Sequence, residues 1–125
     1  MGIVLVSHSE KVANGIKEII MEVAQEVPVA TAGGTDSGEI GTSFVKIVAA
    51  IEEACTDKGA IIFYDLGSAM MNAEMAVEQF PEKNVRIAEH IPILEGAYVA
   101  AVESSMNKDV EEILSVLKNS FQHSK

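Results

Sequence analysis

The first residue whose type and position could do chemistry is His8, which follows the apolar run Ile3–Val6. Ser7 and Glu10 have the Ser-x-x-Glu spacing of a capping box, which predicts that a helix begins beside this histidine. The free N–H groups and positive dipole at a helix start favour anions, so a phosphate on the imidazole would be stabilised there. A neutral imidazole is also a nucleophile near pH 7. Taken alone, His8 could equally be a histidine that only hydrogen-bonds near a helix start.

Asp65 is the second candidate, because it directly follows another apolar run, Ala60–Tyr64. A carboxylate at the end of a neighbouring strand can accept a hydrogen bond from one imidazole nitrogen. That bond fixes the tautomer and leaves the other nitrogen free to attack. Asp65 could instead cap a helix that begins near Ser68 or form the turn Asp-Leu-Gly-Ser, and these roles are compatible with the first.

Residues that could hold phosphate oxygens lie at or just before predicted helix starts. They are Ser9, Thr42, Ser43, Gly67 and Ser68. N-capping explains such hydroxyl residues equally well. The glycines at 33, 34 and 38 match neither the P-loop nor G-x-G-x-x-G, so we expect no nucleotide cradle. His-x-x-x-His and Cys-x-x-Cys spacings are absent, so we expect no metal site. We also expect no cofactor. His90 could line the same site or lie on the surface, and we give no role to His123.

The elements that would position these residues are predicted from apolar spacing. Four short runs read as buried strands: Ile3–Val6, Val27–Thr31, Ala60–Tyr64 and Val85–Ala88. Helical patterns cover Glu10–Glu26, Thr42–Cys55, Ser68–Gln79, Leu94–Met106 and Val110–Leu117. This alternation predicts an α/β three-layer sandwich with a four-stranded, mainly parallel sheet in the order 2-1-3-4, covered by helices on both faces. Residues 1–119 would form one domain, and residues 120–125 a flexible tail.

Bulky apolar residues at three- and four-residue spacing mark the predicted inner faces of the first three helices. They are Val12, Ile16, Ile19, Ile20 and Val23, then Val45, Ile47, Val48 and Ile51, then Met71, Met75 and Val77. Because ligands gather beyond the carboxyl ends of parallel strands, His8, Asp65 and the Gly-rich stretch 31–41 are expected at one edge of the sheet. An exposed Met70 there would suit an adaptable docking surface, although packing is its default role.

Composition excludes several classes of function. The 125 residues carry a net charge of −10, which repels nucleic acid and anionic lipid surfaces. Cys55 is the single cysteine, so no internal disulfide can form. No run approaches the roughly 18 apolar residues of a membrane span, and the N-terminus lacks the basic and apolar regions of a signal peptide. We therefore expect a cytoplasmic protein.

Four motifs together resemble one known family. They are Ile-Val-Leu-Val-Ser-His-Ser at 3–9, Ala-x-Gly-Ile at 13–16, Gly-Thr-Ser-Phe at 41–44 and Asp-Leu-Gly-Ser-Ala-x-Met-Asn at 65–72. They resemble the phosphotransfer subunits (DhaM) of phosphoenolpyruvate-dependent dihydroxyacetone kinases, which are related to the mannose-type EIIA domains of sugar phosphotransferase systems. The resemblance covers nearly the whole chain.

The resemblance implies that His8 is the phosphorylated histidine and Asp65 its carboxylate partner. It further implies an α/β homodimer that receives phosphate from HPr. The phosphate would pass to ADP bound on the DhaL subunit, and ATP formed there would phosphorylate dihydroxyacetone on DhaK. A chain of 125 residues would be the single-domain form, which needs a separate HPr.

Three other interpretations stay open. A mannose-type EIIA domain in sugar import would hand phosphate to an EIIB partner instead. A response-regulator receiver would use Asp65 as acceptor, but Ser7-His8-Ser9 stands where receivers need an acidic pair for Mg²⁺. A free-standing hydrolase would need a basic anchor for its substrate, for which Lys46, one helical turn into its helix, is the nearest candidate.

Overall fold

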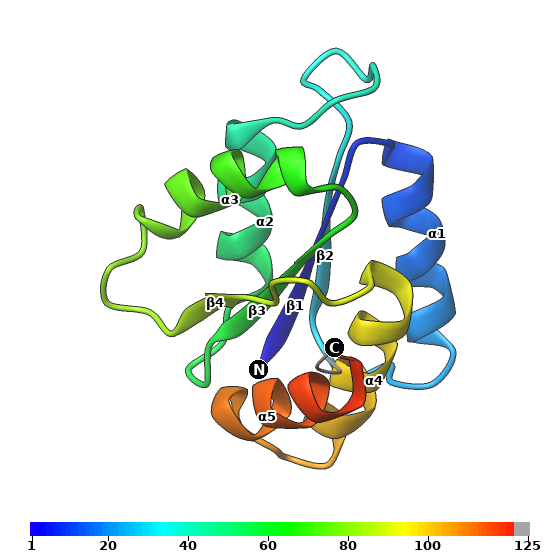
Figure 1. The fold of residues 1–125 in the computed structure, drawn as a ribbon, viewed down its shortest axis with the longest axis vertical. Helices are drawn as coiled ribbons and strands as arrows, with labels where there is room; N and C mark the ends of the chain where they lie inside the picture. Colours follow the sequence, from blue (N-terminus) through cyan, green and yellow to red (C-terminus); the bar gives the residue numbers. More distant parts are fainter. Residues whose placement is uncertain (122–125) are drawn as a thin grey trace.

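A computed structural model of the chain describes residues 1–121 (Figure 1). The strands are β1 (Gly2–Ser7), β2 (Val29–Gly33), β3 (Ala60–Tyr64) and β4 (Val85–Ile87). The helices are α1 (Glu10–Met21), α2 (Phe44–Ala54), α3 (Met70–Val77), α4 (Ile93–Ser105) and α5 (Val110–Phe121), with a short 3-10 turn, η1 (Gly67–Ala69), before α3. The sheet order is β2-β1-β3-β4 and each neighbouring pair is parallel, which confirms the predicted α/β topology.

Helices cover both faces of the sheet (Figure 1), and a separate apolar cluster fills the space on each face. Alternate residues of β1 point to opposite faces, so Ile3 and Leu5 pack with α1, α4 and α5, whereas Val4 and Val6 pack with α2 and α3. All four of these side chains are fully buried. Burial on both faces is typical of parallel sheets and explains why the strand sequences are almost continuously apolar.

Several predicted boundaries shift by a few residues. The second strand begins two residues later than predicted, at Val29, and α1 ends at Met21 instead of continuing to Glu26. Asp109 caps α5: its carboxylate accepts from the Glu112 N–H while the Glu112 carboxylate accepts from the Asp109 N–H. This helix continues to Phe121, so residues 120 and 121 of the predicted tail are helical. The rest of that tail, including His123, lies outside the described residues.

The predicted inner faces of the helices are partly wrong. Val12, Ile19, Val23, Val45, Met71 and Met75 are exposed. In α3 the buried residues are Ala73 and Ala76, and in α1 they are Ala13, Ile16 and Ile20. In α3, alanine therefore occupies the buried positions that a rule based on bulky apolar residues assigns to methionine. No helix within residues 1–121 has the length and apolar character needed to cross a membrane.

Candidate functional site

The candidate site lies where the strand order reverses, at the carboxyl ends of β1 and β3. These two strands are neighbours, with Val6 paired to Tyr64, and the Asp65 N–H donates to the Val6 carbonyl at 3.2 Å. The chain leaves β1 toward β2 on one side and leaves β3 toward β4 on the other. Such a switch point is where open α/β sheets place their ligands. His8 and Asp65 therefore meet because each follows its strand directly.

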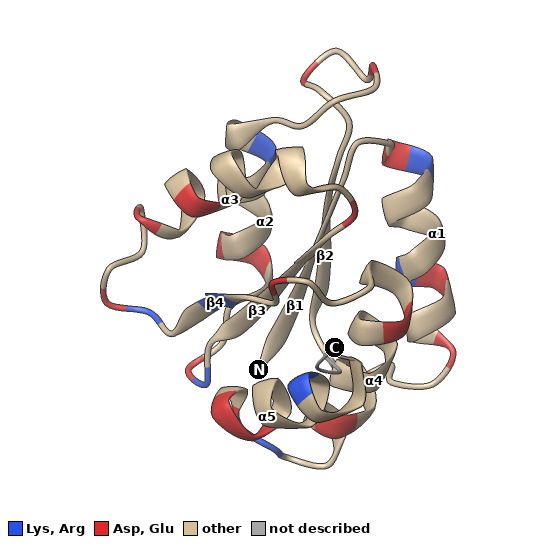
Figure 2. Ribbon diagram, viewed as in Figure 1, with Lys and Arg blue, Asp and Glu red and all other residues tan. Residues whose placement is uncertain are grey.

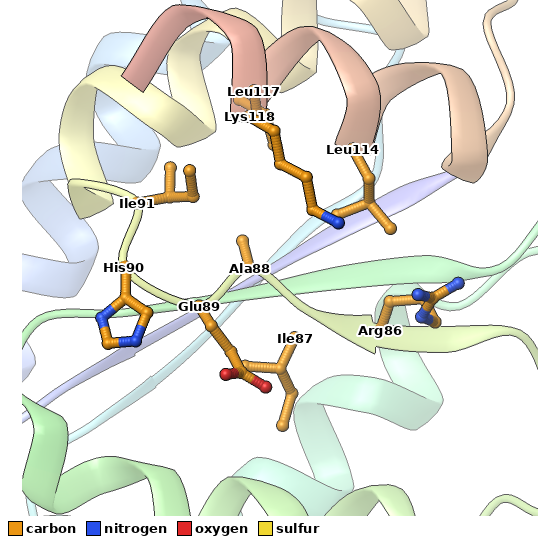
Figure 3. Close-up of a pocket in the computed structure, with 9 residues that line it drawn as sticks. All are labelled: Arg86, Ile87, Ala88, Glu89, His90, Ile91, Leu114, Leu117 and Lys118. Carbon is orange, nitrogen blue, oxygen red and sulfur yellow. The ribbon is translucent and has the colours of Figure 1, made fainter. Parts of the chain in front are cut away.

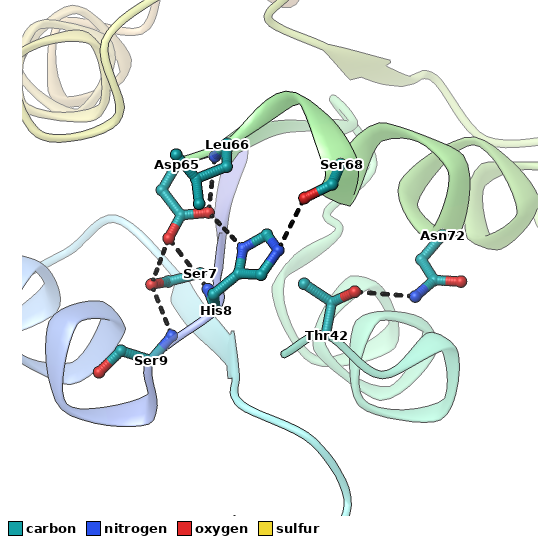
Figure 4. Close-up of polar contacts among 8 residues, drawn as sticks. All are labelled: Ser7, His8, Ser9, Thr42, Asp65, Leu66, Ser68 and Asn72. Atoms are coloured by element: carbon teal, nitrogen blue, oxygen red, sulfur yellow. Dashed lines mark hydrogen bonds and ion pairs between the residues drawn. The ribbon is translucent and has the colours of Figure 1, made fainter. Parts of the chain in front are cut away.

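The Asp65 carboxylate accepts four hydrogen bonds (Figure 4). Its Oδ1 lies 3.0 Å from the His8 Nδ1 and accepts from the Leu66 N–H at 2.7 Å. Its Oδ2 accepts from the His8 N–H at 2.9 Å and from the Ser7 hydroxyl at 2.8 Å. The His8 and Asp65 side chains are each 20% exposed, so the pair is held in place yet open to a reactant.

The charge state of Asp65 sets the role of each imidazole nitrogen. Burial alone would raise the pKa of Asp65, but hydrogen bonds from His8, Ser7 and Leu66 outweigh burial and hold this pKa below its usual value. The carboxylate is thus ionised near neutral pH and needs a proton donor opposite it. The His8 Nδ1 therefore carries the proton in the neutral ring, and Nε2 keeps the lone pair. The Ser68 hydroxyl lies 2.9 Å from Nε2 and can donate to that lone pair.

The helix beside His8 begins differently from the capping-box prediction, which is wrong. Ser9 is the N-cap of α1, and its hydroxyl accepts from the Val12 N–H at 3.3 Å. The Ser7 hydroxyl is fully buried, donates to Asp65 and accepts from the Ser9 N–H at 3.0 Å. The carboxylate next to Ser7 attracts its hydroxyl away from the helix start. His8 still directly precedes the N-cap residue, so it lies beside the positive end of α1.

Asp65 is likewise not the N-cap of the next helix. Leu66 occupies that position before η1 and makes no side-chain capping bond. Ser68 lies inside η1 rather than at the start of α3. Gly67 and Ser68 open this turn, and the first N–H groups of a helical turn have no acceptor within the turn.

The loop between β2 and α2 is tied to His8 through its backbone. The Gly41 N–H donates to the His8 carbonyl at 2.9 Å, and Gly41 has a φ of +144°, which favours glycine. The next residue, Thr42, accepts at its Oγ1 a hydrogen bond from the Asn72 Nδ2 at 2.8 Å. At the start of the loop, a Cβ on Gly33 would lie 2.6 Å from the Cα of Glu10. Glycine there lets β2 end against the start of α1.

Ser43 serves as the N-cap of α2. Its hydroxyl caps α2 by accepting from the Lys46 N–H at 3.1 Å and donates to the Asp36 carboxylate. Lys46, the one basic anchor considered for a hydrolase, donates from its Nζ to the Gly33 carbonyl at 2.8 Å and lies 3.8 Å from Glu10. This ammonium is therefore engaged with β2 and α1.

Two hollows border the end of β4. One, of about 530 Å³, is lined by Asp65, Gly67, Met70 and His90, so His90 lies beside the candidate site and Met70 contributes to its wall. The other, of about 330 Å³, lies between β4 and α5 (Figure 3). Arg86 and Lys118 border this second hollow, and the Arg86 guanidinium is paired with Glu111 at 2.6 Å. Neither His8 nor Asp65 lines it, so it is separate from the imidazole.

Comparison with known proteins places the chain in a family. Residues 2–114 match the family model EIIA-man, described as the PTS system fructose IIA component. The chain belongs to the EIIA-man family. It is 48% identical over 117 residues to the phosphoryl donor subunit DhaM of PEP-dependent dihydroxyacetone kinase 1 from Listeria innocua, and this match covers 94% of the chain and 92% of the relative.

A second DhaM subunit and a solved structure are also similar to this chain. The chain is 45% identical over 100 residues to the phosphotransferase subunit DhaM of the PTS-dependent dihydroxyacetone kinase from Lactococcus lactis, covering 80% of the chain and 79% of that relative. The crystal structure of a protein of unknown function, EF1359, has a TM-score of 0.80 and 34% identity, covering 94% of this chain and 92% of that one. The resemblance to DhaM subunits and the α/β fold predicted from sequence are both confirmed.

Sequence reasoning missed two residues that hold this EIIA-man site together. The Ser-x-x-Glu spacing predicts Ser7 as a helix cap, although its place directly before His8 at a strand end is a usable signal for a role in the site. Asn72 received no role, because its partner Thr42 is 30 residues away in the sequence. The structure brings His8, Asp65 and Ser68 together, links Thr42 to them through Gly41 and Asn72, and leaves Ser43 as a helix cap.

Proposed function

We propose that the chain carries a phosphoryl group on the Nε2 of His8, as the phosphoryl donor subunit of a PEP-dependent dihydroxyacetone kinase. The group is received from phospho-HPr and passed to ADP bound on DhaL, and the resulting ATP serves DhaK. The observation that carries this proposal is the 3.0 Å contact between Asp65 Oδ1 and His8 Nδ1. That contact directs the nucleophilic lone pair to Nε2, the nitrogen that faces away from the carboxylate.

Each transfer is a displacement at phosphorus. The Nε2 lone pair of His8 forms the new N–P bond while the N–P bond of the donor phosphohistidine breaks, and its electron pair returns to the donor imidazole. The product ring is positively charged, with a proton on Nδ1 and the phosphoryl on Nε2. Asp65 stabilises this cation through a charge-assisted hydrogen bond. In the second step a β-phosphate oxygen of ADP attacks the same phosphorus, and the bonding pair returns to Nε2.

Groups around Nε2 are suited to the phosphoryl oxygens. The Ser68 hydroxyl, now 2.9 Å from Nε2, turns from the lone pair to a phosphoryl oxygen when the N–P bond forms. Gly67 and Ser68 are the first two residues of η1, so their N–H groups have no acceptor within that turn and are available to phosphoryl oxygens. Ser9, beside the start of α1, and the Thr42 hydroxyl complete this proposed phosphate site. Ser43 contributes indirectly, because it caps the start of α2 and so helps to fix the end of the loop that carries Thr42.

The surface around His8 suits a basic partner with an apolar centre. The segments that follow β2, β3 and β4 carry acidic side chains and, from 34 to 43, 65 to 79 and 88 to 92, no lysine or arginine (Figure 2). Leu66 is 57% exposed beside Asp65, and Met71 is 72% exposed one residue before Asn72. A donor or acceptor with basic side chains around an apolar contact would be attracted to this edge. We also propose that the chain acts in the cytoplasm as a homodimer, which light scattering would test.

The proposal is tested by intact-mass analysis with phosphoenolpyruvate, enzyme I and HPr. We expect the wild-type chain to gain one phosphoryl group, the His8→Ala variant to gain none, and the His90→Asn control to gain one, since asparagine tolerates the positive φ at that position. Uptake by the His8→Ala variant would refute the assignment. Adding DhaL with ADP should then discharge the phosphoprotein. Discharge only by an EIIB domain would assign the chain to sugar import instead.

A further inference from the structure

Ser68, Thr42 and Asn72 lie on the side of the imidazole to which Nε2 points (Figure 4). The His8 carbonyl accepts from the Gly41 N–H at 2.9 Å, and the adjoining residue, Thr42, accepts from the Asn72 amide at 2.8 Å. Asn72 lies one helical turn beyond Ser68, and the Ser68 hydroxyl returns to the His8 Nε2 at 2.9 Å. The loop that holds Gly41 and Thr42 and the segment that holds Ser68 and Asn72 are thus bonded to each other, and each is also bonded to His8.

The direction of the Asn72 contact determines what Thr42 can do. Asn72 donates from its Nδ2, so the Thr42 oxygen is the acceptor and its own hydroxyl hydrogen is left over. In the part of the chain that the structure describes, no acceptor for that hydrogen lies within hydrogen-bonding distance. Thr42 and Asn72 are both only partly buried, so this part of the site is open to solvent.

We propose that Asn72 is a positioning residue for phosphoryl transfer, because it holds the Thr42 hydroxyl with its hydrogen directed to a phosphoryl group on His8 Nε2. This inference rests on the proposed function and adds a residue to it. Asn72 itself does not touch the phosphoryl group. It acts through Thr42 and, by fixing the position of the loop, keeps the Gly41 contact to His8 in place.

The test compares Asn72 and Thr42 variants in single-turnover transfer from phospho-HPr. A hydrogen bond to a charged phosphoryl oxygen is among the stronger kinds, so we expect Thr42→Val and Asn72→Ala each to slow transfer at saturating phospho-HPr by about tenfold. The concentration of phospho-HPr that gives half the maximal rate should stay unchanged, because neither residue is assigned to partner contact. Thr42→Ser keeps the hydroxyl and should stay within about twofold of the wild type. Thr31→Val, which removes a threonine hydroxyl from β2, is the matched control and should be unaffected.

The double variant Asn72→Ala, Thr42→Val is decisive. If Asn72 acts through Thr42, the double variant is no slower than Thr42→Val alone. If the two residues act independently, the two tenfold losses of transfer rate multiply to about a hundredfold. Multiplication would overturn the inference. Asn72→Asp is nearly isosteric and cannot donate, so it guards against a folding defect in the alanine variant. It should also be slower, and a wild-type rate in this variant would overturn the inference while leaving phosphorylation of His8 intact. A wild-type chain that takes up no phosphoryl group would overturn the proposed function and this inference together.

Discussion

Replacing Asp65 with asparagine isolates the role of its charge, since the two side chains have nearly the same shape. The aspartate accepts four hydrogen bonds, two at each oxygen. Asparagine keeps one oxygen and places an NH₂ group where the other stood. If its oxygen faces the His8 Nδ1, its NH₂ opposes the His8 N–H, and that donor loses its acceptor. If the amide is reversed, its NH₂ faces Nδ1, the proton moves to Nε2, and the nucleophilic lone pair is lost from the reacting nitrogen.

The losses of stability and of transfer rate expected for Asp65→Asn can be estimated from these contacts. An unsatisfied buried donor costs about 1–3 kcal/mol. Because the Asp65 side chain is 20% exposed, water relieves part of that cost, and we expect the variant to lose about 1–2 kcal/mol of unfolding free energy. For transfer, a neutral amide replaces the charge-assisted bond to the phosphorylated ring, a difference of about 1–1.5 kcal/mol or roughly tenfold in rate. The change of tautomer adds to this, so we expect phosphoryl uptake to slow about 10- to 100-fold.

Uptake is measured by rapid quenching with phospho-HPr, and the tautomer by nitrogen NMR of the His8 ring. Asp57→Asn is the matched control, because it removes the same charge in the turn before β3, at the opposite end of the strands. It should transfer at the wild-type rate. An Asp65→Asn variant within about threefold of the wild type, with the proton still on Nδ1, would refute the reasoning that the carboxylate activates Nε2.

Two further predictions concern stability. Ser7→Ala should lower the free energy of unfolding in urea by about 1–3 kcal/mol, because the Ser9 N–H loses its acceptor and Asp65 loses a donor; a change below about 0.5 kcal/mol would contradict this. The pKa of Asp65 is lowered by folding, so its ionised carboxylate stabilises the fold above its unfolded pKa of about 3.9, and this contribution is lost as the pH falls through the lower folded pKa. Between about pH 6 and pH 3 the wild type should therefore lose more unfolding free energy than Asp65→Asn, and equal losses would show that Asp65 is not the group responsible.

Much of the sheet and the central pair of the site could be predicted, because both depend on local features of the sequence. Short apolar runs alternate with helical patterns, and polar residues follow the runs directly. Parallel strands bring such residues to one edge, so the proximity of His8 and Asp65 follows from position alone. The predicted sheet order was also confirmed.

The remaining features depend on contacts between distant segments or on side-chain size. Ser7 has the right spacing for a capping box, but a carboxylate 58 residues away competes for its hydroxyl. The contact between Thr42 and Asn72 requires the loop after β2 to reach α3, which no local pattern encodes. Met71 is exposed while Ala73 and Ala76 are buried in the cluster that also contains residues of α2 and the sheet, so small residues rather than the most apolar ones form the inner face of α3.

The attachment of His8 to β1 has a consequence for how such a protein can diversify. β1 is paired on both sides, and Ile3 to Val6 are fully buried, so the His8 ring is anchored to an inner strand of the sheet. Leu66, which directly follows Asp65, is exposed on a turn, and Met71 is exposed on the first turn of α3. If His8 carries the phosphoryl group as proposed, substitutions at these outer positions would change which proteins exchange phosphate with the ring and would leave the buried strand beneath it intact. On that proposal, the same buried strand end would serve phosphate relays with different protein partners.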